Sequence, residues 1–300
     1  MPELPEVEVV KLFLEDKLLH QTITKLNILT PKSFIGDPKN IINNKIVKFT
    51  RIGKQLSIYL SNGKILLVHL KMTGQLILMP PLSRGGPEGG GVMLGHPTKF
   101  EKYPNKSTRL IFYFSPLSSK RGTKGEILYF NDQRKFGWIK VLTQDELVEA
   151  QKNLGRDIFD RQFSPEYLYR QLQKTVRPIK LALLDQHLFA GIGNIYANDA
   201  LFLAGIHPQL HSNKITLKQA KLIHKSLLGI MRQSVLAGGS TAKDNKYVRP
   251  DGTFGKNQFS FRVYQRVGDP CLKCSTPIKR LKLGGRGTFF CPKCQKLPVK

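Results

Sequence analysis

The four cysteines of this 300-residue chain form two close pairs near its C-terminus. The pairs Cys271-x-x-Cys274 and Cys291-x-x-Cys294 are separated by the sixteen residues 275–290. This spacing is typical of a ribbon in which four thiolates bind one zinc ion (Zn2+) in a tetrahedron. Two disulfides are the alternative, but we expect no secretory leader and see no wider cysteine framework. The pattern therefore predicts one closed, structural zinc site, because a catalytic zinc keeps one ligand position open.

The sixteen residues between the cysteine pairs predict a β-hairpin. Two strand-like runs flank the turn sequence Gly284-Gly285-Arg286-Gly287. A zinc ion can fold such a hairpin even though so short a segment buries little core of its own. The turn would hold Arg286 at its tip, where a planar, always-charged guanidinium suits a phosphate. An ordinary turn with a solvated arginine is the plainer interpretation.

The charge of the chain points to a polyanionic partner. Lysine and arginine number 48 against 21 aspartates and glutamates, a formal net charge of +27. This excess is larger than solubility requires and favours nucleic acid. An anionic membrane surface is the alternative, but no long apolar segment supports it. Together with zinc-type cysteines, which suit a reducing compartment, it predicts a cytoplasmic protein without a membrane partner.

Hydrophobic patterning predicts an α+β fold. A helix is expected over 7–19, and strand-like runs over 23–141 predict an N-terminal antiparallel β-sandwich with flanking helices. One hairpin turn is expected at Ser61-Asn62-Gly63, and residues 80–104 form an expected loop insertion. After residue 143 the pattern becomes helical. Helices are expected at 146–154, 165–174, 178–185, 194–203 and 216–237, followed by a polar loop over 238–255.

The N-terminus carries an unusual chemical group. The chain starts Met1-Pro2-Glu3-Leu4-Pro5, and a small second residue normally permits removal of the initiator methionine. Pro2 would then present a secondary amine, which is partly unprotonated near neutrality because α-amino pKa values are about 7.7–8.0. Such an amine can attack a sugar C1′ and form an iminium directly, with Glu3 as general acid or base. The plainer interpretation is that these residues only begin a helix.

A second candidate anion site lies at Gly191-Ile192-Gly193-Asn194. Asn194 is expected to be the N-cap of the following helix, with free backbone N–H groups for a phosphate. A tight turn would also explain these glycines.

Several segments, in their order and spacing, resemble the formamidopyrimidine-DNA glycosylases. The resemblance covers nearly the whole chain. Its markers are Pro2-Glu3-Leu4-Pro5-Glu6-Val7-Glu8, Arg51-Ile52-Gly53-Lys54, His69-Leu70-Lys71-Met72-Thr73-Gly74, Asn131-Asp132-Gln133-Arg134-Lys135-Phe136-Gly137, Gly191-Ile192-Gly193-Asn194-Ile195-Tyr196-Ala197 and the cysteine ribbon with Gly285-Arg286-Gly287-Thr288.

The resemblance implies a fold and an activity. It implies a catalytic β-sandwich over 1–143, a helix-two-turns-helix DNA-binding domain over 144–250 and a zinc finger over 251–300. It implies a monomeric base excision repair enzyme that excises oxidised purines from damaged double-stranded DNA and then nicks the strand.

The resemblance also implies residue roles. Pro2 would be the Schiff-base nucleophile and Glu3 a proton donor, with Lys54 and Arg286 completing the catalytic set. Met72, Arg134 and Phe136 would fill the gap left by an everted base, because unstacking costs a few kcal/mol that new contacts must offset. The remaining DNA contacts would come from His69, Lys106, Arg109, Lys174, Arg177, Lys180 and Asn194.

Departures from the family pattern and two alternatives accompany this resemblance. Lys135 and Ser107 stand where the family often has arginine and histidine. An endonuclease VIII-like enzyme acting on oxidised pyrimidines is one alternative, although Leu4 argues against it. A non-catalytic zinc-ribbon protein that binds nucleic acid is the other, and it would make the N-terminus incidental.

Overall fold

The computed structural model describes residues 2–79, 103–116, 125–241 and 247–297. Most of the expected insertion at 80–104 and part of the loop at 238–255 lie outside these residues. The chain divides into two compact units. The first unit contains Met1–Lys152 and Ala237–Lys256, and the second contains Asn153–Leu236 and Asn257–Lys300. We call Ala237–Lys256 the return segment, because it follows the helices of the second unit in sequence but belongs to the first.

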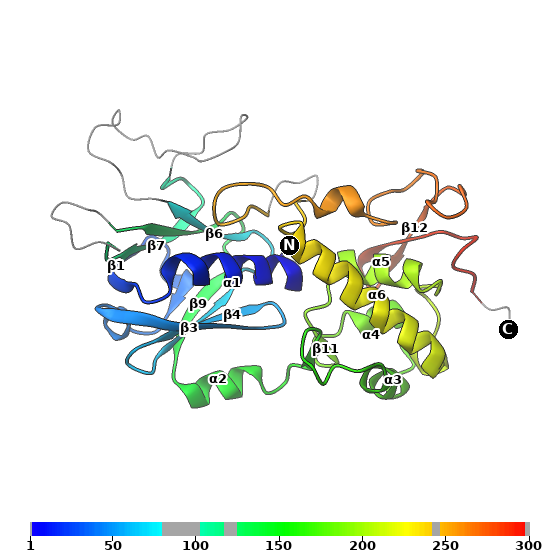
Figure 1. The fold of residues 1–300 in the computed structure, drawn as a ribbon, viewed down its shortest axis with the longest axis horizontal. Coiled ribbons are helices and arrows are strands. Elements are labelled where there is room, and N and C mark those ends of the chain that lie inside the picture. The colour runs from blue at the N-terminus through cyan, green and yellow to red at the C-terminus, as the bar shows by residue number, and fades with distance from the viewer. Residues whose placement is uncertain (1, 80–102, 117–124, 242–246, 298–300) are drawn as a thin grey trace. The chain divides into compact units, whose positions relative to one another are not determined.

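The first unit is the predicted antiparallel β-sandwich (Figure 1). Its strands join in the order β2-β9-β5-β4-β3-β1-β7-β8-β6, and only β2 and β9 run parallel. The strands are β1 (Thr22–Ile28), β2 (Phe34–Ile35), β3 (Asn44–Ile52), β4 (Gln55–Leu60), β5 (Ile65–His69), β6 (Gly74–Met79), β7 (Thr108–Phe114), β8 (Ile127–Asp132) and β9 (Trp138–Leu142). The hairpin predicted at Ser61-Asn62-Gly63 joins β4 to β5, and Gly63 has the positive φ of 78° that its turn requires.

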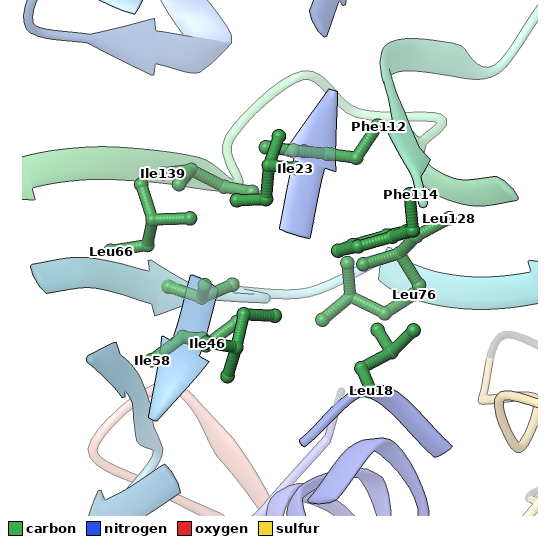
Figure 2. Close-up of a pocket in the computed structure, with 11 residues that line it drawn as sticks. Leu18, Ile23, Ile46, Ile58, Leu66, Leu76, Phe112, Phe114, Leu128 and Ile139 are labelled. Carbon is green, nitrogen blue, oxygen red and sulfur yellow. The ribbon is translucent and has the colours of Figure 1, made fainter. Parts of the chain in front are cut away.

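The core of the first unit lies between the two halves of this sheet. Strand β1 pairs with β3 only through Thr22 and Ile23 and with β7 over most of its length, so the sheet folds over at β1. Figure 2 shows the apolar side chains that meet in between, with Leu66 and Ile58 on one side and Leu128 and Phe114 on the other. All side chains that line this pocket are apolar, which marks it as packed core and not as a polar ligand site.

Helix α1 (Leu4–Leu18) closes one end of this core. It begins three residues earlier than expected, and its buried face repeats at helical spacing through Val7, Val10, Leu14 and Leu18. Helix α2 (Gln144–Gln151) has a capping box. Short 3-10 helices η1 (Pro31–Ser33) and η2 (Pro38–Asn40) connect the early strands. Packing of α1 against the sandwich therefore fixes the position of the N-terminus in the first unit.

The second unit contains the predicted helices, most with slightly different ends. They are α3 (Pro165–Gln173), α4 (Ile179–Leu183), α5 (Asn194–Leu203) and α6 (Leu217–Leu236), with η3 (Ser212–Lys214) before α6, η4 (Asn257–Ser260) after it, and a small parallel pair β10 (Arg156–Asp157) and β11 (Phe189–Ala190). Helix α6 packs against α3 and α5. None of the helices in the described part of the chain is long and apolar enough to span a membrane.

The C-terminal hairpin has the expected strands but a shorter turn than predicted. Strands β12 (Lys279–Leu283) and β13 (Arg286–Phe290) pair directly, with Leu283 opposite Arg286. Gly284 and Gly285 form the turn with φ values of 54° and 75°, a combination that favours glycine. Arg286 is therefore the first residue of β13 and not the tip of the turn.

Candidate active site

The N-terminal turn is tightly held within the first unit. Pro2 and Glu3 are both buried, and Glu3 is the N-cap of α1. The Glu6 carboxylate accepts the Glu3 N–H through Oε2 at 2.9 Å and the Ser240 N–H through Oε1 at 2.9 Å. One carboxylate thus ties the turn that carries Pro2 to the return segment.

Lys54 lies in the tight turn between β3 and β4, where Gly53 has a φ of 59°. The Arg51 side chain stabilises this turn through two contacts. Its Nε is 2.5 Å from Oε2 of Glu8 on α1, and one terminal nitrogen donates to the Gly53 carbonyl at 3.0 Å. The turn that carries Lys54 is therefore anchored to α1, the helix whose N-cap is Glu3.

His69 ends β5 close to Lys54. Burial, together with the positive charges of Lys71 and Lys54, lowers the pKa of His69 from 6.5 to about 3. The ring is therefore neutral near pH 7. Its Nδ1 accepts the Lys71 N–H at 3.0 Å, so the ring proton is on Nε2. His69 offers one N–H donor to an anion without adding charge.

The three predicted wedge residues are close together. Met72 and Phe136 are exposed, at 41% and 53%. Arg134 joins them, because one of its terminal nitrogens lies 2.9 Å from the Met72 Sδ and its guanidinium lies 5.0 Å from the centre of the Phe136 ring. Taken alone, the sequence pattern of Met72 and Phe136 also fits core residues, and the structure places both on the surface. We call Met72, Arg134 and Phe136 the wedge.

The two other cations expected to contact DNA from the first unit differ in exposure. Lys106 is exposed in the turn before β7. Arg109 is only 7% exposed, and its Nε donates to the Asp132 carbonyl at 2.8 Å. A DNA contact from Arg109 would involve only its terminal nitrogens, because the rest of the side chain supports the end of β8.

Three predicted phosphate ligands of the second unit gather at the zinc hairpin. The Asn194 side chain donates to the Gly287 carbonyl at 3.2 Å, and the Lys180 ammonium donates to the same carbonyl at 2.8 Å. Arg286, next to Gly287, is exposed. Asn194 is the first residue of α5, and Gly193 holds the N-cap position that the sequence predicted for Asn194.

Lys180 is held inside the second unit. Its side chain is fully buried, and its ammonium also donates to the Thr288 hydroxyl at 2.8 Å. Helix α4 turns the Lys180 side chain toward the hairpin, and a phosphate contact from Lys180 stays a prediction. The residue supports the strand that begins with Arg286.

Lys174 and Arg177 lie near the end of α3 and are exposed. Arg177 is paired with Asp185 at 2.7 Å. A phosphate would have to compete with this carboxylate, so we expect a smaller contribution from Arg177 than from Lys174.

The four cysteines lie together as predicted. Their Sγ atoms all lie within 4.8 Å of one another, and three of the separations are 3.9, 3.5 and 3.4 Å. Tetrahedral thiolates at about 2.3 Å from zinc are about 3.8 Å apart, so the cluster fits one zinc ion. The set of ligands is Cys271, Cys274, Cys291 and Cys294. With four thiolates the zinc site is closed and structural.

Two side chains of helix α5 accept hydrogen bonds from backbone N–H groups in and before the zinc ribbon. The Asp199 carboxylate accepts the N–H groups of Arg262, Val263 and Tyr264 at 2.9–3.0 Å. The Asn198 side-chain oxygen accepts the Phe289 N–H at 2.8 Å. Burial raises the pKa of Asp199, and the three N–H bonds oppose that rise. These contacts were missed from the sequence, because nothing local shows which backbone groups a helix carboxylate will bind.

Three family models match successive parts of the chain. Residues 1–139 match the family described as "Formamidopyrimidine-DNA glycosylase N-terminal domain", 154–246 the "Formamidopyrimidine-DNA glycosylase H2TH domain" and 268–297 the "Zinc finger found in FPG and IleRS". The chain is 36% identical to formamidopyrimidine-DNA glycosylase from Bacillus licheniformis, covering 99% of this chain and 100% of the relative.

Solved structures give the same result. The MutM (Fpg) protein of Thermus thermophilus is similar with a TM-score of 0.82 and 31% identity, covering 99% of this chain and 100% of that chain. The Lactococcus lactis Fpg, solved in complex with DNA containing an abasic site, is similar with a TM-score of 0.82 and 28% identity over the same shares.

Proposed function

The chain belongs to the formamidopyrimidine-DNA glycosylase family, and on that premise we propose that it excises oxidised purines from duplex DNA and then nicks the strand. The proposed lesions are 8-oxoguanine and formamidopyrimidines in damaged double-stranded DNA. The protein would act as a monomer inside the cell, where this DNA is. The observation that best supports this proposal is that Pro2 and Glu3 lie in a buried turn held by Glu6.

Pro2 would perform the covalent step. After removal of Met1, its amine forms a bond to C1′ of the damaged nucleotide and loses its proton. The bond from C1′ to the base breaks, and the base leaves with the bonding electron pair and takes up a proton. Glu3 gives a proton to the sugar ring oxygen, which opens the ring and leaves an iminium between Pro2 and C1′. Loss of a C2′ proton then expels the 3′ phosphate by β-elimination, and a δ-elimination expels the 5′ phosphate.

Charged and neutral donors in both units would grip the DNA backbone. Lys54 and the neutral His69 supply them in the first unit, and Arg286 and Asn194 in the second. For Arg286, phosphate electrostatics are the proposed main role, because a guanidinium does not release its proton near neutral pH.

A set of lesion duplexes tests this function. We expect cleavage of a duplex carrying 8-oxoguanine opposite C and of one carrying an abasic site. Selective cleavage of dihydrouracil would indicate the endonuclease VIII-like alternative instead. Binding without cleavage of any of the three duplexes would indicate a non-catalytic DNA-binding protein.

Arg134 is expected to read the base opposite the lesion. Arg134→Ala should lower the preference for C over A by about 1–3 kcal/mol, because a guanidinium offers paired donors to a base edge. Thermal stability should change little, since the side chain is exposed. Excision rates on the two duplexes measure the preference, and Gln133→Ala, in the same turn, is the control. A melting point that collapses while the preference stays intact would make Arg134 a structural residue.

Arg286 is expected to contribute one ionic contact to DNA binding. Each such contact adds roughly −0.9 to the slope of log affinity against log salt on duplex DNA. Arg286→Ala should therefore reduce the slope by about one and weaken binding to damaged and undamaged duplexes alike. Lys293→Ala removes one charge elsewhere on the ribbon and should leave the slope nearly unchanged. Equal changes in both variants would show that only net charge matters and that Arg286 does not reach DNA.

A further inference from the structure

A buried carboxylate lies directly beneath the wedge. Asp132 ends β8 and is 0% exposed. Its Oδ2 accepts the Gly137 N–H at 2.6 Å, and its Oδ1 accepts the Arg134 N–H at 3.1 Å. Asp132 therefore holds both ends of the turn that carries Arg134 and Phe136. Three donors in total satisfy it, because the Thr73 hydroxyl also donates to Oδ1.

The Thr73 hydroxyl connects this turn to the third wedge residue. Thr73 follows Met72 directly and is 3% exposed. Its Oγ1 donates to Asp132 and accepts the Arg134 N–H at 3.1 Å. Two segments separated by about sixty residues of sequence thus share one buried hydrogen-bonded pair. Removing the hydroxyl leaves Met72 and Arg134 without this shared anchor.

Contacts within the wedge do little to hold its three residues in place. Its two apolar members are exposed, and Lys135 between Arg134 and Phe136 has a φ of 58°, which non-glycine residues adopt at a cost. Gly137 fits tightly, since a Cβ there would lie 2.8 Å from the Phe130 ring and 3.2 Å from Oδ2 of Asp132. Buried contacts to Asp132 and Thr73 therefore hold the turn in place.

From these contacts we infer that Asp132 and Thr73 are positioning residues that set how strictly the protein reads the base opposite the lesion. The inference rests on the proposed function, in which Arg134 reads that base. A guanidinium distinguishes one base from another only when its donors are aligned with the acceptors on the base edge. A misplacement of about 1 Å can lower a rate by about a hundredfold. The buried hydrogen bonds to the Asp132 carboxylate hold Arg134 in that alignment.

Thr73→Val tests the inference with an almost isosteric change. We expect the ratio of excision opposite C to excision opposite A to fall by about tenfold or more. Thr73→Ser keeps the hydroxyl and should restore most of the ratio. Asp132→Asn places an amide NH2 against either the Gly137 N–H or the Arg134 N–H, and it should lower the ratio at least as much. The ratio is insensitive to the fraction of folded protein, because unfolding lowers both rates equally.

Ile58→Val is the matched control, because it trims the core of the same unit away from the wedge. It should lower thermal stability slightly and leave the ratio unchanged. The wild-type protein distinguishes failure of the proposed function from failure of the positioning role. If it does not excise 8-oxoguanine, the proposed function fails. If it excises with a preference for C that Thr73→Val retains in full, the positioning role is overturned.

Discussion

Replacing Pro2 with glycine should lower the rate of base excision by about a hundredfold or more, because the reacting nitrogen loses its ring and its fixed position. Glycine still provides a primary amine, so we expect slow residual activity. A primary amine gives an imine that must be protonated to act as an electron sink, whereas the iminium formed by the proline nitrogen is always charged. Single-turnover excision from an 8-oxoguanine duplex measures this effect without interference from product release.

Pro5→Ala is the matched control for this change. Pro5 lies in the first turn of α1, where proline is favoured, but it does not carry the terminal amine. Its replacement should cost little activity. Intact mass of the wild-type protein should lack the initiator methionine. A fully active protein that retains Met1, or equal losses in the two variants, would contradict a nucleophilic Pro2.

Removal of zinc should abolish tight DNA binding while the β-sandwich stays folded. Structural zinc contributes about 10 kcal/mol or more to folding of such small modules, so the hairpin should unfold without it. Arg286 and the contacts of Lys180 and Asn194 with Gly287 would then be lost together. We expect duplex affinity to fall by about a hundredfold, because the proposed phosphate contacts of Arg286 and Asn194 disappear together.

The chain provides its own probe for this experiment. Trp138 is the one tryptophan of the sequence and lies in β9 of the first unit. Its fluorescence melting curve should change little after chelation or in Cys291→Ser, while binding is lost. Zinc added back after chelation should restore binding to the wild-type protein but not to Cys291→Ser. Intramolecular disulfides in active protein, or active protein without metal, would show that the cysteines do not form a zinc site.

Features carried by local spacing were predictable from the sequence. The two cysteine pairs predicted a zinc ribbon, and the four Sγ atoms lie together. The expected range 194–203 coincides with α5. The hairpin turn after β4 was also correct, because Asn-Gly between apolar runs specifies it locally.

Features that depend on distant partners were not predictable. Strand β1 is a weak strand in isolation, since its residues alternate poorly between buried and exposed positions. Its partners, β3 at its start and β7 over most of its length, are seen only in the structure. The sequence likewise cannot show that Lys180 turns inward to Gly287, or that Glu6 binds Ser240 across more than two hundred residues. The same limit concealed Asp132, whose role depends on its contact with Thr73.

Borohydride trapping on an 8-oxoguanine duplex, followed by mapping of the protein–DNA adduct, tests the central claim most directly. Borohydride reduces the iminium to a stable amine, so the DNA stays attached to the residue that attacked C1′. We expect one covalent adduct, located on the N-terminal peptide at Pro2. An adduct on Lys54 or on any other lysine, or strand cleavage without an adduct, would contradict the account.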